Sequence, residues 1–246
     1  MNYTELQVKL FGSNNLLLFF DTNVAIGYVF NGDKWNTQAK NIFKCPNQKY
    51  YSDNVFIEIE RKIKIISKEI NVALLFISAE ILKYQSDDDQ LTLEDTLKFI
   101  SSLNLIRRLN IKQARVEMLK KYVSILFSTK YAYDINKNEL SKDIKQEANN
   151  FRNEYNTNFN FIQTVLIKHN KKHNHNSLKR KLLNSDKDFH IDDVKIILDA
   201  HDLGLTQNPL TYVTADSKRN LNALIIKNTN IDNVKDLREF FIFKCP

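Results

Sequence analysis

The sequence predicts a helix-rich α/β protein in which a mostly helical region is inserted into a domain with a central parallel sheet. Residues 16–20 are a run of large apolar side chains that ends at Asp21, a pattern typical of a strand buried on both faces of a parallel sheet. Only four Gly and three Pro interrupt 246 residues, which favours long helices over many short strands. Residues 66–185 show helical periodicity and little alternation.

Composition narrows the class of protein. A hydrophobic fraction of 43% is ordinary for a globular protein, and the net charge of +7 suits a polyanionic partner, although Lys-rich proteomes produce the same excess. Two cysteines are too few for a disulfide scaffold or a Cys-based zinc site. The chain has no signal-peptide pattern and no apolar run near 18 residues. We therefore expect a cytoplasmic protein with no membrane partner.

The amino-terminal part is predicted to alternate strands and helices. Asp21 ends the first strand at the position where α/β sheets bind ligands, although it could equally only cap the next helix. We expect helices over 22–30 and 34–43, a strand over 49–52 and a helix from Asn54, capped by Ser52 or Asp53.

The helix that begins near Asn54 carries two acids. Its apolar positions follow helical spacing, at Val55, Ile59, Ile63 and Ile66. Glu58 and Glu60 lie roughly 200° apart around such a helix, so at most one of them points toward Asp21. Glu58 lies beside the apolar stripe, whereas Glu60 is expected in solvent.

A helical region is expected between two parts of a discontinuous domain. The predicted domain comprises 1–65 and 187–246, and the insertion covers 66–186 as a substrate-selecting cap, a partner platform or an oligomer interface. Helices are predicted over 74–82, 91–109, 111–133 and 139–167. Glu94 and Asp95 stand in the first turn of the second of these, where the helix dipole favours acids.

The end of the insertion is strongly basic. Residues 168–181 contain six Lys and Arg and no acid, and the residues proposed to contact nucleic acid are Lys171, Lys172, Lys179, Arg180 and Lys181. The same composition is typical of a solvated linker, which is the interpretation that we favour. The three histidines of this stretch match no standard helical metal-ligand spacing, so we expect disorder rather than a metal site.

Regular structure is predicted to return with a helix over 190–204. Around the axis of this helix, the expected buried apolar positions lie within about 80° of Asp193. Asp193 therefore shares the buried face in the first turn. Asp192 is the expected N-cap. Asp199 is expected at a solvated flank and Asp202 on the opposite side.

A second strand is predicted to end near an acid. Residues 210–214 follow the turn signal Asn208-Pro209, and Asp216 stands just beyond them in the same relation as Asp21. The remainder supplies a helix over 220–226, a strand over 231–234 and a closing helix or strand over 237–243.

Four acids are thus selected by position alone: Asp21, Glu58, Asp193 and Asp216. Neighbouring parallel strands would bring Asp21 and Asp216 to one sheet edge. Two carboxylates about 4 Å apart repel by about 4 kcal/mol at an effective dielectric of 20, so such a cluster requires cations. Oxygen ligands without Cys or His favour Mg²⁺ or Mn²⁺. Asp192 and Asp199 remain alternatives for the third position.

In order along the chain, these segments resemble the PIN-domain nucleases, which include the VapC-like toxins. The matching residues are Leu16–Val24 with Asp21, Ser52 to Glu58-Ile59, Asp193 to Ala200, and Val213-Thr214 with Asp216. The resemblance implies a three-layer fold and an endoribonuclease whose four acids hold one or two Mg²⁺ or Mn²⁺ ions. It also implies that Asn23, Thr214 and Asp192 orient these four acids without binding the metal themselves.

The implied reaction is hydrolysis of RNA by metal-activated water, leaving 5′-phosphate and 3′-hydroxyl ends. An antitoxin or other protein regulator, and a second copy of the chain, are partners consistent with this family. The longer segment between the second and third acids departs from the compact members. The alternatives are an inactive PIN-like binding module and a structure-specific DNA nuclease. A dehalogenase-like phosphatase is disfavoured because Asn23 stands where it needs an acid, and dinucleotide binding because no Gly-rich turn is present.

Overall fold

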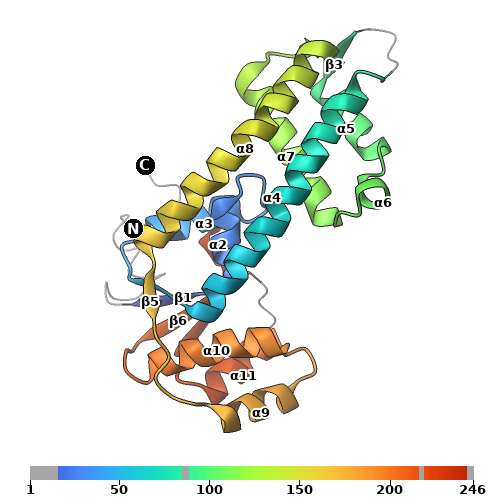
Figure 1. Ribbon diagram of the computed structural model, residues 1–246. Helices are drawn as coiled ribbons and strands as arrows, with labels where there is room; N and C mark the ends of the chain where they lie inside the picture. The colour runs from blue at the N-terminus through green and yellow to red at the C-terminus, as the bar shows by residue number, and fades with distance from the viewer. Residues whose placement is uncertain (1–15, 85–88, 216–218, 243–246) are drawn as a thin grey trace. The chain divides into compact units, whose positions relative to one another are not determined.

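Two compact units make up the described chain, which in this computed structural model comprises residues 16–84, 89–215 and 219–242 (Figure 1). The first unit takes its described residues from 1–28, 35–60 and 160–246, and the second consists of 29–34 and 61–159. Helices α4 (Asp53–Ile81) and α8 (Lys137–Val165) contain unit boundaries. Residues 160–186, which we expected in the insertion, are grouped with the sheet.

The first unit contains a five-stranded parallel sheet flanked by helices, as the fold class predicted from the sequence requires. The strand order is β5 (Ile167–His169), β2 (Lys49–Ser52), β1 (Leu17–Phe20), β6 (Leu210–Thr214) and β7 (Asn233–Asp236). Its helices are α2 (Thr22–Val29), α3 (Asn36–Lys44), α9 (Asn176–Ser185), α10 (Ile191–Gly204), α11 (Arg219–Asn228) and the 3₁₀ helix η1 (Leu237–Ile242).

Strand β1 lies at the centre of this sheet because its side chains are apolar on both faces. Leu18, Phe19 and Phe20 are fully buried, which is the environment of a strand with neighbours on both sides. Strand β1 pairs in parallel with β2 and with β6, and Phe20 lies opposite Val213. The strands that precede Asp21 and Asp216 are therefore hydrogen-bonded neighbours.

The second unit is mostly helical. It contains most of α4 and α8 together with α5 (Leu93–Ser102), α6 (Leu105–Leu109) and α7 (Gln113–Lys130), and a two-stranded antiparallel ribbon of β3 (Gln90–Thr92) and β4 (Asp134–Asn136). Buried Ser78 and Ser141 exchange hydrogen bonds between α4 and α8, since each hydroxyl donates to the other residue's carbonyl, at 3.0 and 2.7 Å. The Phe151 ring stacks on Phe30 and contacts Tyr122 edge-on, and these three rings form an aromatic cluster in the core of this unit.

Three local predictions for the insertion are corrected by the structure. The helices expected from Asn54 and over 74–82 form one continuous α4, because neither Gly nor Pro interrupts it. The helix expected over 91–109 is divided into α5 and α6 by Asn104, whose positive φ of 48° ends a right-handed helix. Strands β3 and β4 were not expected, since each has three residues and one buried side chain.

Among the helices that the structure describes, none combines the length and the apolar character that a membrane span requires.

Candidate functional site

Asp21 lies at the carboxyl edge of the sheet, between the ends of its two central strands. Strand β1 ends at Phe20, and the backbone amide of Asp21 donates to the carbonyl of Val213 on β6 at 2.9 Å. The chain then enters α2 at Thr22. This is the edge at which open α/β sheets bind ligands.

The Asp21 carboxylate is held by two donors. Its Oδ1 accepts from the backbone amide of Thr22 at 2.7 Å, and its Oδ2 accepts from the Thr214 hydroxyl at 2.8 Å. The residue is only 8% exposed. A buried carboxylate needs such donors to offset its lost hydration, so the two bonds also fix the direction in which its oxygens point.

Glu58 is connected to Asp21 through Thr22. The Thr22 hydroxyl donates to Glu58 Oε2 at 2.8 Å, while the Thr22 amide donates to Asp21. Thr22 is 1% exposed and Glu58 is half-buried, so the Thr22 end of this bridge is shielded from solvent. Our sequence interpretation did not select Thr22. Its position directly after the strand-terminal acid was the only available signal.

Asp193 shares a small cavity with Asp21 and Thr214. The cavity has a volume of about 60 Å³, and its remaining lining consists of Phe189, Ile197, Tyr212, Leu221, Asn222 and Ile225. Asp193 stands in the first turn of α10, where the amino-terminal end of the helix favours a carboxylate. This volume accommodates a small ion or water molecules, which need polar partners of the kind present here.

Other predicted site residues are placed differently. Asp216 lies outside the described residues. Asn23 is half-buried in α2, next to Thr22. Asp192 was wrongly predicted as N-cap, since α10 begins at Ile191 and His190 is its N-cap. The Asp192 side chain is 64% exposed and accepts from Lys195 at 2.8 Å.

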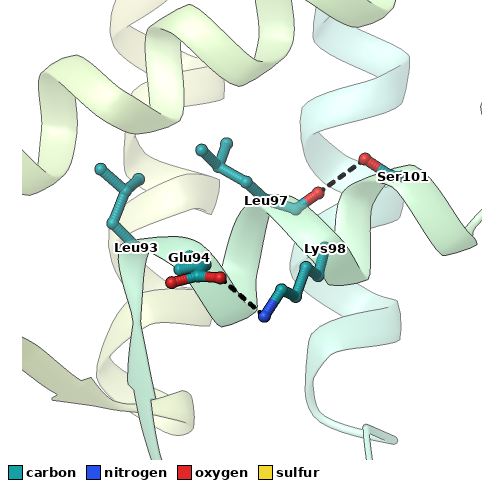
Figure 2. A pocket seen from close by; sticks show the side chains of 5 residues that line it. All are labelled: Leu93, Glu94, Leu97, Lys98 and Ser101. Atoms are coloured by element: carbon teal, nitrogen blue, oxygen red, sulfur yellow. Dashed lines mark hydrogen bonds and ion pairs between the residues drawn. The ribbon is translucent and has the colours of Figure 1, made fainter.

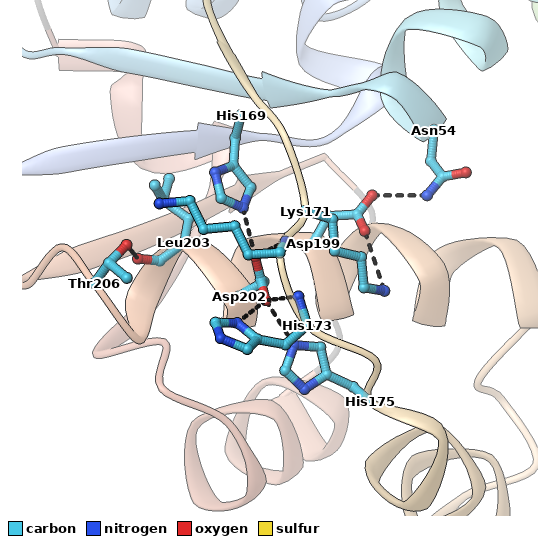
Figure 3. A network of polar contacts seen from close by, with 10 residues as sticks. Asn54, His169, Lys171, His173, His175, Asp199, Asp202, Leu203 and Thr206 are labelled. Carbon is cyan, nitrogen blue, oxygen red and sulfur yellow. Dashed lines mark hydrogen bonds and ion pairs between the residues drawn. The ribbon is translucent and has the colours of Figure 1, made fainter.

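Asp199 is buried rather than solvated. It is 1% exposed, and its Oδ2 accepts from the Asn54 side chain at 2.7 Å. The Lys171 ammonium lies 3.5 Å from Oδ1, which makes no hydrogen bond within the described residues. Ion pairing at this distance still offsets part of the desolvation cost, so Asn54 and Lys171 explain why the acid is tolerated here (Figure 3).

The basic stretch is structured, contrary to the disorder expected for 168–181. Strand β5 occupies Ile167–His169 at the edge of the sheet, beside β2, and α9 begins at Asn176. Lys172 is exposed, whereas Lys171 is close to Asp199. Helix α9 packs against α10 and α11, which line the cavity, and it carries the other predicted cations, Lys179, Arg180 and Lys181.

The histidines of this stretch gather around Asp202, which sequence analysis placed away from any site. Asp202 Oδ2 accepts from His169 Nε2 at 3.0 Å and from the Lys172 amide at 2.8 Å. Its Oδ1 is approached by His173 Nδ1 at 2.8 Å, by the His173 amide at 3.0 Å and by His175 Nε2 at 2.9 Å (Figure 3). Residues about thirty positions apart in sequence provide no local pattern, so this cluster was missed.

The pKa values of Asp202 and of its neighbour His201 are both lowered, but for different reasons. Burial alone would raise the pKa of Asp202, but hydrogen bonds from the Lys172 amide and the three histidines hold that pKa well below its usual value. Burial, followed by the nearby His175, lowers the pKa of His201. The Asn230 amide donates to His201 Nδ1 at 2.8 Å, which requires a neutral ring with its proton on Nε2.

The histidine cluster around Asp202 and the carboxylates near Asp21 differ in how closely their possible metal ligands converge. Within 16–84, 89–215 and 219–242, the one set of three or more His, Cys, Asp or Glu side chains with closely converging ligand atoms is His173, His175 and Asp202. Asp21, Glu58 and Asp193 do not form such a set, so binding one ion through all three requires their side chains to turn.

The second unit contains a larger hollow of about 580 Å³ along α5 (Figure 2). Leu93 and Leu97 line it, and its charged residues Glu94 and Lys98 pair with each other at 2.7 Å. Ser101 also lines it, and its hydroxyl donates to the Leu97 carbonyl at 2.8 Å, so the polar side chains of this hollow are engaged with each other or with the backbone.

Comparisons of the chain with protein-family models, curated proteins and solved structures found no significant match.

Proposed function

We propose that the first unit is a PIN-like, Mg²⁺- or Mn²⁺-dependent nuclease that hydrolyses RNA at the carboxyl edge of its sheet. The observation that carries this proposal is the shared cavity: Asp21 and Asp193, which are distant in sequence, line it together with Thr214. Glu58 is connected to Asp21 through the buried Thr22.

The residues present fit a hard divalent cation. Asp21, Glu58 and Asp193 offer oxygen ligands only, which is the donor type that Mg²⁺ and Mn²⁺ prefer. Once their side chains turn toward it, a cation would also offset the mutual repulsion of these carboxylates. Asp21, Asp193, Glu58 and Asp216 would hold the ion, which supplies Lewis-acid chemistry for phosphodiester hydrolysis.

The protein's own residues would orient the acids and exclude bulk water. Thr214 and the Thr22 amide fix the Asp21 carboxylate, and the Thr22 hydroxyl fixes Glu58. Phe189, Ile197 and Ile225 give the cavity an apolar wall, which strengthens electrostatic interactions inside it.

Substrate would be recruited by the cations of α9. Lys179, Arg180 and Lys181 are carried by a helix that packs on α10 and α11, both of which line the cavity. Such side chains bind phosphates without reading bases, so they supply affinity rather than sequence preference. An antitoxin-like regulator would compete for the same polyanion-binding face.

The test is cleavage of labelled single-stranded RNA by the full chain in Mn²⁺, with branched DNA as a parallel substrate. Asp21→Asn and Asp193→Asn should each abolish cleavage, because each removes a charged oxygen ligand while keeping the side chain's shape. Glu58→Gln should also lose activity, whereas its matched control Glu60→Gln should retain it. Circular dichroism and melting temperature verify folding. Full RNA cleavage by folded Asp21→Asn would contradict the proposal, and cleavage of branched DNA alone would reassign the substrate.

A further inference from the structure

A second polar centre in the sheet unit surrounds Asp202, near the other end of α10. Asp193 and Asp202 are nine positions apart on this helix (202 − 193), so their backbones are separated by roughly 13.5 Å along its axis. The Asp202 side chain is fully buried, and the segment between β5 and α9 wraps around it (Figure 3). This centre is therefore distinct from the carboxylate cavity.

The Oδ1 atom of Asp202 has more nitrogen neighbours than lone pairs. It has two lone pairs, yet the His173 amide, His173 Nδ1 and His175 Nε2 all lie within 3.0 Å of it. On the other oxygen, His169 Nε2 and the Lys172 amide already fill both positions. With their protons on the opposite ring nitrogens, both imidazoles can present a lone pair to a cation placed between them and Oδ1.

The arrangement matches the ligand set of a transition metal. His173 Nδ1, His175 Nε2 and a carboxylate oxygen of Asp202 lie within 4.8 Å of one another. Zinc–ligand bonds of about 2.0–2.1 Å place two ligands of a tetrahedral site roughly 3.3 Å apart. The nitrogen–oxygen distances of 2.8 and 2.9 Å need only a small outward movement to reach that spacing.

We propose that His173, His175 and Asp202 bind one Zn²⁺ ion, and that this ion fastens the segment between β5 and α9 onto α10. Two imidazoles and one carboxylate favour Zn²⁺ over the hard ions that suit the all-oxygen cavity. His169 and the Lys172 amide would orient Asp202 through Oδ2, as outer hydrogen bonds do in metal sites. The His173 side chain is 54% exposed, which gives the ion access from solvent.

The experiment is a Zn²⁺ titration of the metal-free full chain by calorimetry, together with the metal content of desalted protein and thermal melts with Zn²⁺ or EDTA. One equivalent of Zn²⁺ should bind and raise the melting temperature, because an ion that binds only the folded state stabilises it. Losing a direct ligand, by His173→Ala or His175→Ala, should weaken binding more than His169→Gln, for which roughly 10–100-fold is expected.

Two variants serve as controls. His190→Ala removes an exposed histidine outside the cluster and should bind Zn²⁺ like the unaltered chain. Asp21→Asn should bind it equally well even if nuclease activity is lost, which separates this proposal from the preceding one. A chain that binds no Zn²⁺, or whose binding survives loss of both His173 and His175, would overturn the site and leave a purely hydrogen-bonded cluster.

Discussion

The Thr214 hydroxyl on β6 donates to Asp21 Oδ2 at 2.8 Å, which joins the carboxyl ends of the two central strands. Thr214→Val keeps the shape of the side chain and removes this donor. We expect Mn²⁺-dependent cleavage to fall roughly 10–100-fold, as when outer hydrogen bonds of metal sites are lost. Steady-state RNA cleavage measures this, and Thr214→Ser, which keeps the hydroxyl, should restore most activity. Equal activities of the Val and Ser variants would show that this bond does not orient Asp21.

Asn54 stabilises the sheet unit through the buried Asp199. Its side chain donates to Asp199 Oδ2 at 2.7 Å, and Oδ1 makes no hydrogen bond within the described residues. Because bonds to charged groups contribute about 1.5–3 kcal/mol, Asn54→Ala should lower the free energy of unfolding by an amount in that range. Denaturant unfolding measures it. Asn54→Asp should destabilise further by placing two carboxylates together, and a neutral result for both would contradict this role.

Gly204 allows α10 to approach the loop before β7. A Cβ atom on this residue would lie 2.0 Å from the carbonyl oxygen of Asn230, a backbone atom that cannot rotate away. Gly204→Ala should therefore destabilise by about 1–3 kcal/mol, despite the better helix propensity of Ala. Gly27→Ala is the comparison, since its nearest contact would be a Trp35 side-chain carbon at 3.1 Å. Similar melting temperatures for both variants would argue against a close backbone approach at Gly204.

Glu154 in the second unit is expected to make stability depend on pH. Burial raises the pKa of Glu154, and its Oε1 accepts from the Tyr122 hydroxyl at 3.2 Å. A raised folded-state pKa favours the protonated acid. The unfavourable contribution is therefore absent below the unfolded value of about 4.3 and grows as pH rises through the folded value.

Glu154→Gln keeps an acceptor for Tyr122 and removes the ionisable group. It should raise the melting temperature near neutral pH, and the difference should shrink toward zero as pH falls below about 4. Melting curves of both proteins across this range test the sign. A stabilisation that grows at acid pH would be opposite to the expectation.

The cations of α9 should make RNA binding sensitive to salt if they contact phosphates. Replacing Lys179, Arg180 and Lys181 with Ala should weaken binding and reduce the slope of log affinity against log salt by about 0.7 for each lost single-strand phosphate contact. Titrations with Asp193→Asn as the parent protein, in which the proposed cleavage should be lost, measure this without loss of the RNA. An unchanged slope would place the RNA-binding surface elsewhere.

The central sheet was predictable because its signals are local. Apolar runs mark β1 and β6, and Asp21 follows β1 directly. The pairing of these two strands entered the prediction only as the condition for Asp21 and Asp216 to share one sheet edge, and the structure shows that β1 and β6 do pair. Strand β5 has no such signal, since it is a three-residue edge strand containing Lys168 and His169.

The residues whose surroundings were predicted incorrectly have partners that are remote in sequence. Asp199 is buried because Asn54 and Lys171 reach it from other elements, and helical periodicity carries no information about such partners. The same holds for Asp202 and its histidines. The N-cap prediction was wrong for a different reason: α10 begins at Ile191, so Asp192 is already helical.

The central place of β1 in the order β5-β2-β1-β6-β7 has a consequence for synthesis on the ribosome. Strand β1 emerges first among the five, yet β6, its neighbour on one side, follows only after the whole second unit has been made. Until then, the edge of β1 that pairs with β6 has no strand beside it. Contacts between residues so distant in sequence form slowly. A nascent chain stalled before residue 210 would therefore expose an open strand edge to chaperones.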